Sequence, residues 1–417
     1  MFYYIYELLQ GIDIPGVGLF RYISFRSAMA FVLALLIAIP VGKRMIAYLQ
    51  RRQFGEQVRD LGLAGQKAKE GTPTMGGVII IAATLVPTLL FAKLTNVYVV
   101  IMLVSLIWLG AIGLTDDLLK SRRHTKAGLN GWYKILFQAL LGLFVALSLN
   151  LSPQAMVPQA REQAEEARVV EVLEVGEQRE DLSEKPSRER VKNLRTTIPF
   201  FKNNELDYRK LVPIEGRLGR ALAWGLFTLV VILIVLSVSN GANLTDGLDG
   251  LATGVTAPVA VTLMVLAYVS GNAVYSSYLH IIYIPYIGEL VVFMSAFLGA
   301  LIGFLWNNAY PAKIFMGDTG SLTIGGVIGI YSVLVRKELM LPILCGVFLV
   351  ESLSVILQVS YFKYTRHRYG EGRRIFLMTP IHHHYQKRGI PEPRIVMHFW
   401  IVSMLLSVLA IVTLKIR

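Results

Sequence analysis

The chain contains 417 residues, of which 54% are hydrophobic and 17% charged, and its mean hydropathy is +0.54. This composition excludes an ordinary soluble protein and predicts an integral membrane protein. The net charge of +13 does not indicate a nucleic acid partner, because the basic residues gather in short segments between apolar runs, where they orient the protein and attract anionic lipid headgroups. The single cysteine, Cys345, excludes a disulfide framework, and nothing at the N-terminus predicts a cleaved signal peptide.

Apolar segments of roughly the 20 residues that a spanning helix needs recur along the whole chain. We predict an all-α integral membrane protein with about ten transmembrane helices in one domain, residues 1–417. The predicted spans are 22–42, 74–93, 97–115, 132–151, 220–239, 251–269, 286–306, 321–335, 340–362 and 395–414.

Basic residues are concentrated in three connections, at 43–69, 120–134 and 363–394. With ten spans these connections fall on one side of the membrane, which the positive-inside rule identifies as the cytoplasm. Both termini are then expected outside, and the polar motifs described below face the cytoplasm.

A polar insertion at about 152–218 interrupts the pattern. Residues 154–189 are rich in Glu, Gln and Arg and contain no aromatic residue, which is typical of a solvated segment. We expect this insertion on the extracytoplasmic side, away from the motifs.

Asp116 and Asp117 close the third predicted span. Neighbouring helical residues point about 100° apart, so one carboxylate can hold a structural partner while the other reaches a ligand. The alternative is a solvated helix end, countered by Lys120.

A second acidic motif runs from Asn243 to Gly250 and contains Asp246 and Asp249. The two aspartates share a face if the segment is helical. Alternatively, Asn243 caps the following helix and Asp249 pairs with a lysine. A calcium-binding EF-hand does not fit, because the ligand at the twelfth position is missing.

The third motif follows the seventh predicted span and includes Asn308, Phe315 and Asp318. Glycines on both sides of Asp318 permit close approach of a ligand, and the helix expected from Ser321 offers free amide hydrogens to an anion. A carboxylate combined with phosphate oxygens suits Mg²⁺. The alternative is a capped turn with a solvated aspartate.

Three consecutive histidines, His382, His383 and His384, follow Pro-Ile. Zinc is disfavoured, because consecutive helical residues do not converge on one ion and no cysteine is near. Histidines among many basic residues are better suited to donate hydrogen bonds to phosphate or nucleotide oxygens; simple surface exposure is the alternative. Lys69 adds a cation on the same side.

One membrane face thus combines carboxylates for a metal, cations for phosphates and histidines for hydrogen bonding. Phosphoryl transfer needs these groups, because its transition state spreads negative charge that a metal and cations stabilise. One substrate is expected to be lipid-borne, since water-soluble substrates do not require ten spans.

Taken in order, the motifs resemble those of the phospho-N-acetylmuramoyl-pentapeptide transferases of bacterial cell-wall synthesis, over nearly the whole chain except the insertion. They are Pro73–Gly77 (Pro-Thr-Met-Gly-Gly), Asp116-Asp117, Asn243–Asp249, Phe315–Ser321 and Pro380–His384. The wider superfamily of polyprenyl-phosphate N-acetylhexosamine-1-phosphate transferases shares the aspartate motifs. The triple histidine and Pro-Thr-Met-Gly-Gly favour the muramoyl-pentapeptide branch.

The resemblance implies a Mg²⁺-dependent, multi-pass enzyme of the bacterial inner (plasma) membrane. It would transfer phospho-N-acetylmuramoyl-pentapeptide from its UDP-linked form to undecaprenyl phosphate, which gives UMP and lipid I of peptidoglycan synthesis. By position, Asp318 is the expected metal ligand, and Asp116 and Asp117 are the pair that activates the lipid phosphate, with His382 also catalytic. The expected substrate-binding residues are Lys69, Lys120, Lys134, Asn243, Asp246, Asp249, Asn308, Phe315, His383 and His384.

Two alternatives stay open at this point, besides the choice between a monomer and a homodimer. The first is transfer of N-acetylglucosamine-1-phosphate to the same lipid. The second is a lipid transporter, for which ionisable residues deep in the spans would be the signature. Glu351 and Gln358 are the candidates, and pairing within the bundle explains them equally well.

Overall fold

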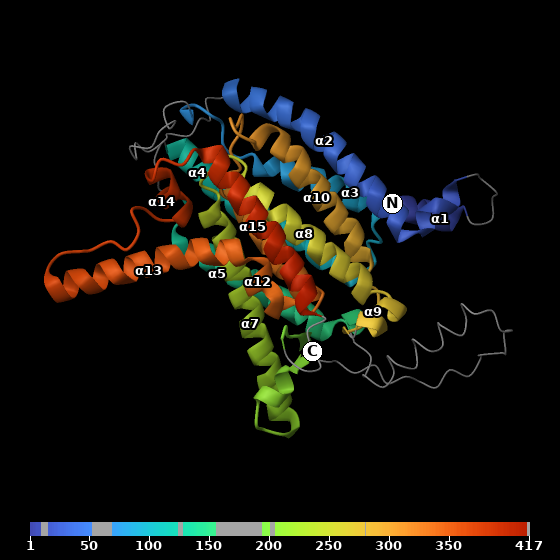
Figure 1. The fold of residues 1–417 in the computed structure, drawn as a ribbon. Coiled ribbons are helices and arrows are strands. Elements are labelled where there is room, and N and C mark those ends of the chain that lie inside the picture. The colour runs from blue at the N-terminus through green and yellow to red at the C-terminus, as the bar shows by residue number, and fades with distance from the viewer. Residues whose placement is uncertain are drawn as a thin grey trace, which may run out of the picture.

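The computed structural model describes residues 1–9, 16–51, 69–123, 128–155, 194–200, 205–279 and 281–414. This part of the chain is mainly helical (Figure 1). The long helices are α2 (Ile23–Arg51), α3 (Gly77–Phe91), α4 (Val97–Arg123), α5 (Gly131–Leu151), α7 (Gly216–Thr245), α8 (Leu251–Ser270), α10 (Glu289–Asn308), α11 (Gly317–Leu334), α13 (Gly346–Tyr369) and α15 (Glu392–Thr413). Shorter helices are α1 (Phe2–Leu8), α9 (Ala273–Leu279), α12 (Leu341–Leu344) and α14 (Ile381–Lys387).

Eight of the described helices are long and apolar enough to cross a membrane, which confirms the predicted integral membrane protein. They coincide with eight of the ten predicted spans. The remaining two predictions, 74–93 and 321–335, also fall on helices. These are α3, an apolar helix of 15 residues, and α11, an 18-residue helix whose first turn contains Asp318.

Several helix boundaries differ from the prediction, and the differences place functional side chains. Helix α4 continues to Arg123, so Asp116 and Asp117 lie within a helix and not at its end. Helix α11 begins at Gly317, four residues before the expected start, so Asp318 is part of its first turn. Helix α13 starts at Gly346 and extends beyond the predicted end at 362.

The centre of the bundle is formed by α10 and α11. Helix α10 packs against α2, α3 and α8, while α11 packs against α4 and α7. Small residues allow the closest approaches, as in many membrane bundles. A Cβ on Gly77 would lie 2.1 Å from the Gly320 nitrogen, and one on Gly113 would lie 2.3 Å from the Asp318 carbonyl oxygen. Helices α3 and α4 therefore each pack directly against the first turns of α11.

The helical fold class is confirmed, and among the described residues one small antiparallel sheet, formed by part of the insertion, is added to it. Strands β1 (Arg195–Thr197) and β2 (Glu205–Asp207) pair with Thr196 opposite Leu206. The sheet is attached to the chain that follows α11. The Lys337 ammonium donates to the Thr197 hydroxyl (2.7 Å), and the Tyr208 hydroxyl donates to Glu338 (3.2 Å). Most of the insertion, 156–193 and 201–204, lies outside the described residues.

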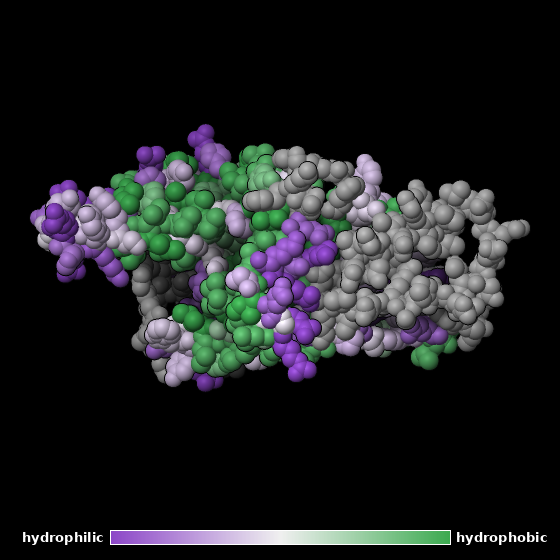
Figure 2. Space-filling model, turned by 90° about the horizontal axis from the view of Figure 1, so that it is seen from below, coloured by the Kyte–Doolittle hydropathy of each residue, from purple (hydrophilic) through white to green (hydrophobic). Residues whose placement is uncertain are grey.

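Large hydrophobic surfaces remain on the outside of the bundle, as expected for helices that face lipid. Figure 2 shows green hydrophobic side chains over much of the lower face, and a hydrophilic tip at the left where α13 projects from the body. This tip carries the exposed residues Arg366, His367 and Arg368. Helix α13 therefore changes from apolar to basic along its length, which is typical of a helix that leaves the membrane.

Candidate active site

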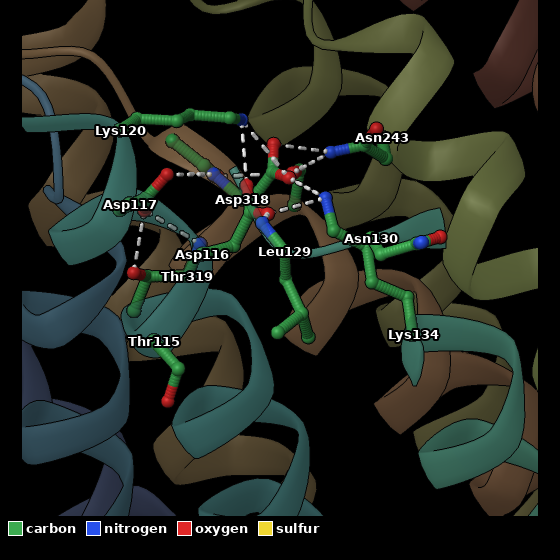
Figure 3. A network of polar contacts seen from close by, with 12 residues as sticks. Thr115, Asp116, Asp117, Lys120, Leu129, Asn130, Lys134, Asn243, Asp318 and Thr319 are labelled. Atoms are coloured by element: carbon green, nitrogen blue, oxygen red, sulfur yellow. Dashed lines mark hydrogen bonds and ion pairs between the residues drawn. The ribbon is translucent and has the colours of Figure 1, made fainter. Parts of the chain in front are cut away.

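Three carboxylates meet between two helices. Asp116 and Asp117 come from α4 and Asp318 comes from α11, and one oxygen of each lies within 4.8 Å of the others. Figure 3 shows this group with Lys120 on one side and Asn243 on the other. Oxygen ligands in this number could hold a hard divalent cation.

Asp116 is fully buried and is held from several directions. Its Oδ1 accepts a hydrogen bond from the Leu129 backbone (2.6 Å) and lies 2.9 Å from Nζ of Lys134. Its Oδ2 lies 2.7 Å from Nζ of Lys120. Both lysines also reach Oδ2 of Asp318, at 3.2 Å for Lys120 and 2.6 Å for Lys134. The two ammonium groups therefore bridge two carboxylates that would otherwise repel each other.

Asp117 points at the first turn of α11. It accepts hydrogen bonds from the backbone nitrogens of Asp318 (3.1 Å) and Thr319 (2.9 Å) and from the Thr319 hydroxyl (2.6 Å). The first amide groups of a helix lack partners inside the helix, so Asp117 acts as their cap from another helix. Gly317 is needed here, because its φ is +69° and a Cβ would lie 2.6 Å from the Asp117 carboxylate.

Asp318 is the one of these three carboxylates that a ligand can reach. Its side chain is 15% exposed, whereas that of Asp116 is 0% exposed. The Asn243 amide donates to Asp318 Oδ1 (2.9 Å) and to the Ser321 hydroxyl (2.8 Å). Asn243 lies in the last turn of α7, so the alternative in which it caps the following helix is wrong.

A second charged cluster joins three distant segments. Nζ of Lys69 lies 2.6 Å from Asp249 and 2.5 Å from Glu392, the first residue of α15. The pairing of Asp249 with a lysine is thus confirmed. Asp246 and Asp249 lie in the turn after α7, which ends at Thr245, so they do not share a helical face. Glu392 could not be predicted from the sequence, because a single carboxylate at a helix start carries no distinguishing pattern.

Asn308 and Phe315 hold the loop between α10 and α11. Asn308 is buried, accepts a hydrogen bond from the Thr253 hydroxyl (3.2 Å) and donates to the Ile314 carbonyl (3.0 Å). The backbone of Phe315 donates to the Pro73 carbonyl (2.8 Å) and accepts from the Gly76 nitrogen (2.9 Å). The Pro-Thr-Met-Gly-Gly motif therefore lies directly against the loop that leads to Asp318.

The three histidines of α14 point to different partners, as expected for consecutive helical residues. His382 is fully buried, and its Nδ1 lies 3.1 Å from Glu351 in α13. His383 Nδ1 is 2.7 Å from the Gln386 amide oxygen, and His384 Nδ1 accepts from the Leu377 nitrogen (3.1 Å). Burial, together with the neighbouring His382, lowers the pKa of His383 to about 4. The ring of His383 is therefore neutral near pH 7.

A cluster of carboxylates and lysines at the ends of membrane helices is the kind of site found in membrane enzymes that act on phosphates. Similarity to known proteins identifies the class as the phosphoglycosyl transferases. Residues 197–336 match the model of glycosyl transferase family 4, and residues 69–81 match phospho-N-acetylmuramoyl-pentapeptide-transferase signature 1. The phospho-N-acetylmuramoyl-pentapeptide-transferase of Flavobacterium psychrophilum is 53% identical over 418 residues, with both chains covered completely. Proteins of the same description from Parabacteroides distasonis and Amoebophilus asiaticus are 49% and 51% identical, again with complete coverage of both chains.

The chain belongs to the phospho-N-acetylmuramoyl-pentapeptide transferases. It is therefore a phosphoglycosyl transferase of peptidoglycan synthesis that makes lipid I, and a multi-pass protein of the inner membrane. It acts on a UDP-linked sugar-peptide and a polyprenyl phosphate. The resemblance stated from the motifs is confirmed, and the transporter alternative is wrong.

Proposed function

We propose that the cluster of Asp116, Asp117 and Asp318 is where phospho-N-acetylmuramoyl-pentapeptide passes from its UDP-linked form to undecaprenyl phosphate. The observation that carries this proposal is the partly exposed Asp318 carboxylate, flanked by Lys120 and Lys134. Charge on a transferring phosphoryl group needs such a combination of anionic metal ligands and cations.

Mg²⁺ is the metal we propose. Carboxylate oxygens are ligands that Mg²⁺ prefers, usually one or two of them together with waters and phosphate oxygens. Asp318 is the first candidate ligand because it is exposed, whereas Asp117 is engaged by the amides of α11. Oδ2 of Asp116 is buried and lies 2.7 Å from Nζ of Lys120, so we do not propose Asp116 as a second ligand. When bound, the ion would neutralise charge on the pyrophosphate.

Lys120 and Lys134 would hold the phosphates during transfer. Each contacts two carboxylates and is partly exposed, so each can turn part of its hydrogen bonding toward an incoming anion. An oxygen of the lipid phosphate attacks the β-phosphorus, and the bond from that phosphorus to the bridging oxygen breaks, so UMP leaves with that oxygen. A phosphate monoester is largely ionised near neutral pH, so we favour direct attack, with Asp116 and Asp117 as positioning groups for the lysines and for α11.

The remaining predicted residues are proposed to surround the nucleotide and the sugar. Lys69 and Asp249 lie in the second cluster, and Asp246 lies in the same turn as Asp249. Asn308 and Phe315 shape the loop beside them. The histidines of α14 complete this proposed region. Their proximity to the turn after α7 supports this, because Gly247 in that turn lies against His382.

The topology we propose has ten spans, with α3 and α11 added to the eight apolar helices. Both termini are then outside and the site faces the cytoplasm. The chain forms a single membrane domain, and its 152–218 insertion lies on the extracytoplasmic side. The positive-inside rule supports this arrangement, because the basic segments flank the site. A homodimer stays a prediction.

The direct test is an assay of purified protein with UDP-N-acetylmuramoyl-pentapeptide, undecaprenyl phosphate and Mg²⁺. We expect release of UMP that requires all three components. UDP-N-acetylglucosamine in place of the pentapeptide nucleotide should give no UMP, and turnover of that sugar instead would assign the chain to the other branch of the superfamily.

A further inference from the structure

Helix α13 carries a polar stripe that faces the segment leading to the histidines. Glu351, Gln358 and Thr365 are spaced seven residues apart, which places them on one face of the helix. All three are buried in a helix whose other positions are largely apolar or exposed. Polar groups buried at this spacing need partners, and their partners lie in one stretch of chain.

Each member of the stripe holds a different part of residues 373–382. The Thr365 hydroxyl accepts a hydrogen bond from the Arg373 nitrogen (2.9 Å). The Gln358 amide oxygen accepts from the nitrogens of Ile375 and Phe376, both at 3.0 Å. Glu351 is the third member, and its Oε2 lies 3.1 Å from Nδ1 of His382.

The contact between Glu351 and His382 is isolated from solvent. Both side chains are 0% exposed, and among the described residues neither ring nitrogen and neither carboxylate oxygen has a well-aligned hydrogen bond. A buried polar group without a partner costs about 1–3 kcal/mol, and the 3.1 Å approach of opposite polarity between Nδ1 and the carboxylate offsets part of that cost. The other nitrogen, Nε2, faces Gly247, where an added Cβ would lie only 2.2 Å away.

We propose that Glu351 is a positioning residue for the transferase reaction: its carboxylate fixes Nδ1 of His382 and thereby directs Nε2 toward the segment Asn243–Asp249. The proposal rests on the substrate region proposed above. A carboxylate 3.1 Å from Nδ1 fixes the orientation of the imidazole ring. The other ring nitrogen, Nε2, is then held against Gly247, inside the segment that we propose contacts the nucleotide substrate.

The test is a double-mutant cycle on UMP release, with kcat and KM measured separately for both substrates. Loss of a group that orients another functional side chain typically costs about 10- to 100-fold, so we expect Glu351→Gln to lower kcat in this range and to leave the KM for undecaprenyl phosphate nearly unchanged. In a His382→Ala background, the same substitution should change kcat by less than about twofold, because the group that Glu351 orients is gone.

Ser354→Ala is the matched control, since Ser354 is buried one turn away and its hydroxyl donates to the Glu351 backbone carbonyl (2.7 Å). It should leave kcat near that of the wild type. If Glu351→Gln does not purify as a monodisperse protein, Glu351→Asp takes its place, because it keeps the charge and shortens the reach; an intermediate loss of kcat is then expected.

A kcat for Glu351→Gln within about twofold of the wild type would overturn the proposal. So would an equal fold loss with and without His382, which would mean that Glu351 only supports packing. A His382→Ala variant with full activity would remove the proposal together with the role of His382, but not the transferase function. Absence of UMP release by the wild type would refute the proposed reaction itself.

Discussion

The Asp117 side chain accepts two hydrogen bonds from Thr319, one from its backbone nitrogen at 2.9 Å and one from its hydroxyl at 2.6 Å. These contacts tie α4 to the first turn of α11, the turn that carries Asp318. The orientation of the exposed carboxylate is therefore set by a buried one on another helix.

Thr319→Val tests this coupling, because valine keeps the shape of threonine and removes the hydroxyl. A hydrogen bond to a charged group contributes about 1.5–3 kcal/mol, and its loss should lower the melting midpoint and the rate of UMP release together. Thr319→Ser retains the donor and should stay within a few fold of the wild type. Equal effects of the two substitutions on both measurements would show that the hydroxyl does not matter.

Asp318→Asn should abolish most of the activity. The substitution keeps the size of the side chain and removes the charge proposed to bind Mg²⁺, and loss of one such electrostatic contributor often costs on the order of a hundredfold or more. UMP release measured over a Mg²⁺ titration should also show a weaker dependence on the metal. Near wild-type activity with an unchanged Mg²⁺ dependence would move the metal to Asp116, Asp117 or Asp246.

The proposed topology can be tested with single cysteines, because the native cysteine, Cys345, is buried. Glu371→Cys and Arg388→Cys lie at exposed positions on either side of α14, and Tyr278→Cys lies at an exposed position in the last turn of α9. In sealed right-side-out vesicles, an impermeant maleimide should label the cysteine at 278 and should label those at 371 and 388 only after the membrane is opened. Labelling at 371 in sealed vesicles would contradict the ten-span arrangement.

The insertion should be dispensable for turnover only in its central part. Gln154 accepts a hydrogen bond from the Val97 nitrogen (3.0 Å), and Tyr208 donates to the buried Glu338. We therefore expect replacement of 156–189 by a short Gly/Ser linker to leave UMP release within a few fold. Tyr208→Phe leaves a buried carboxylate without this donor, which costs about 1–3 kcal/mol, and should lower the melting midpoint. A linker variant as inactive as Asp318→Asn would show a catalytic or folding role for the insertion.

The free energy of unfolding should decrease as the pH falls, and protonation of His383 in the unfolded chain should account for part of this decrease. The folded-state pKa of about 4 lies below the ordinary histidine value, so the unfolded chain binds a proton first as the pH drops, and stability is lost progressively from about pH 6.5 toward pH 4. His383→Gln should therefore reduce the difference between the melting midpoints at about pH 7 and pH 5. His367→Gln, at the exposed end of α13, is the control and should leave that difference unchanged.

The sequence by itself determined that the protein lies in a membrane, where its long helices run, and which motifs carry the chemistry. Hydrophobic length and charge distribution are local properties, so ten of the described helices fall on the ten predicted segments. The ordered motifs were sufficient to identify the family, because carboxylates, lysines and histidines at membrane boundaries are costly unless they have a function or a partner.

Only the tertiary structure decided which partner each of these groups has. Asp117 and Thr319 are 202 positions apart, and Lys69 and Glu392 are 323 apart, so no local pattern connects them. Glu351 could be recognised as a buried charge in a span, but its contact with His382 depends on how α13 packs against α14. Hydrogen bonds are short and directional, so these pairings follow from the packing of whole helices and cannot be read from the residues alone.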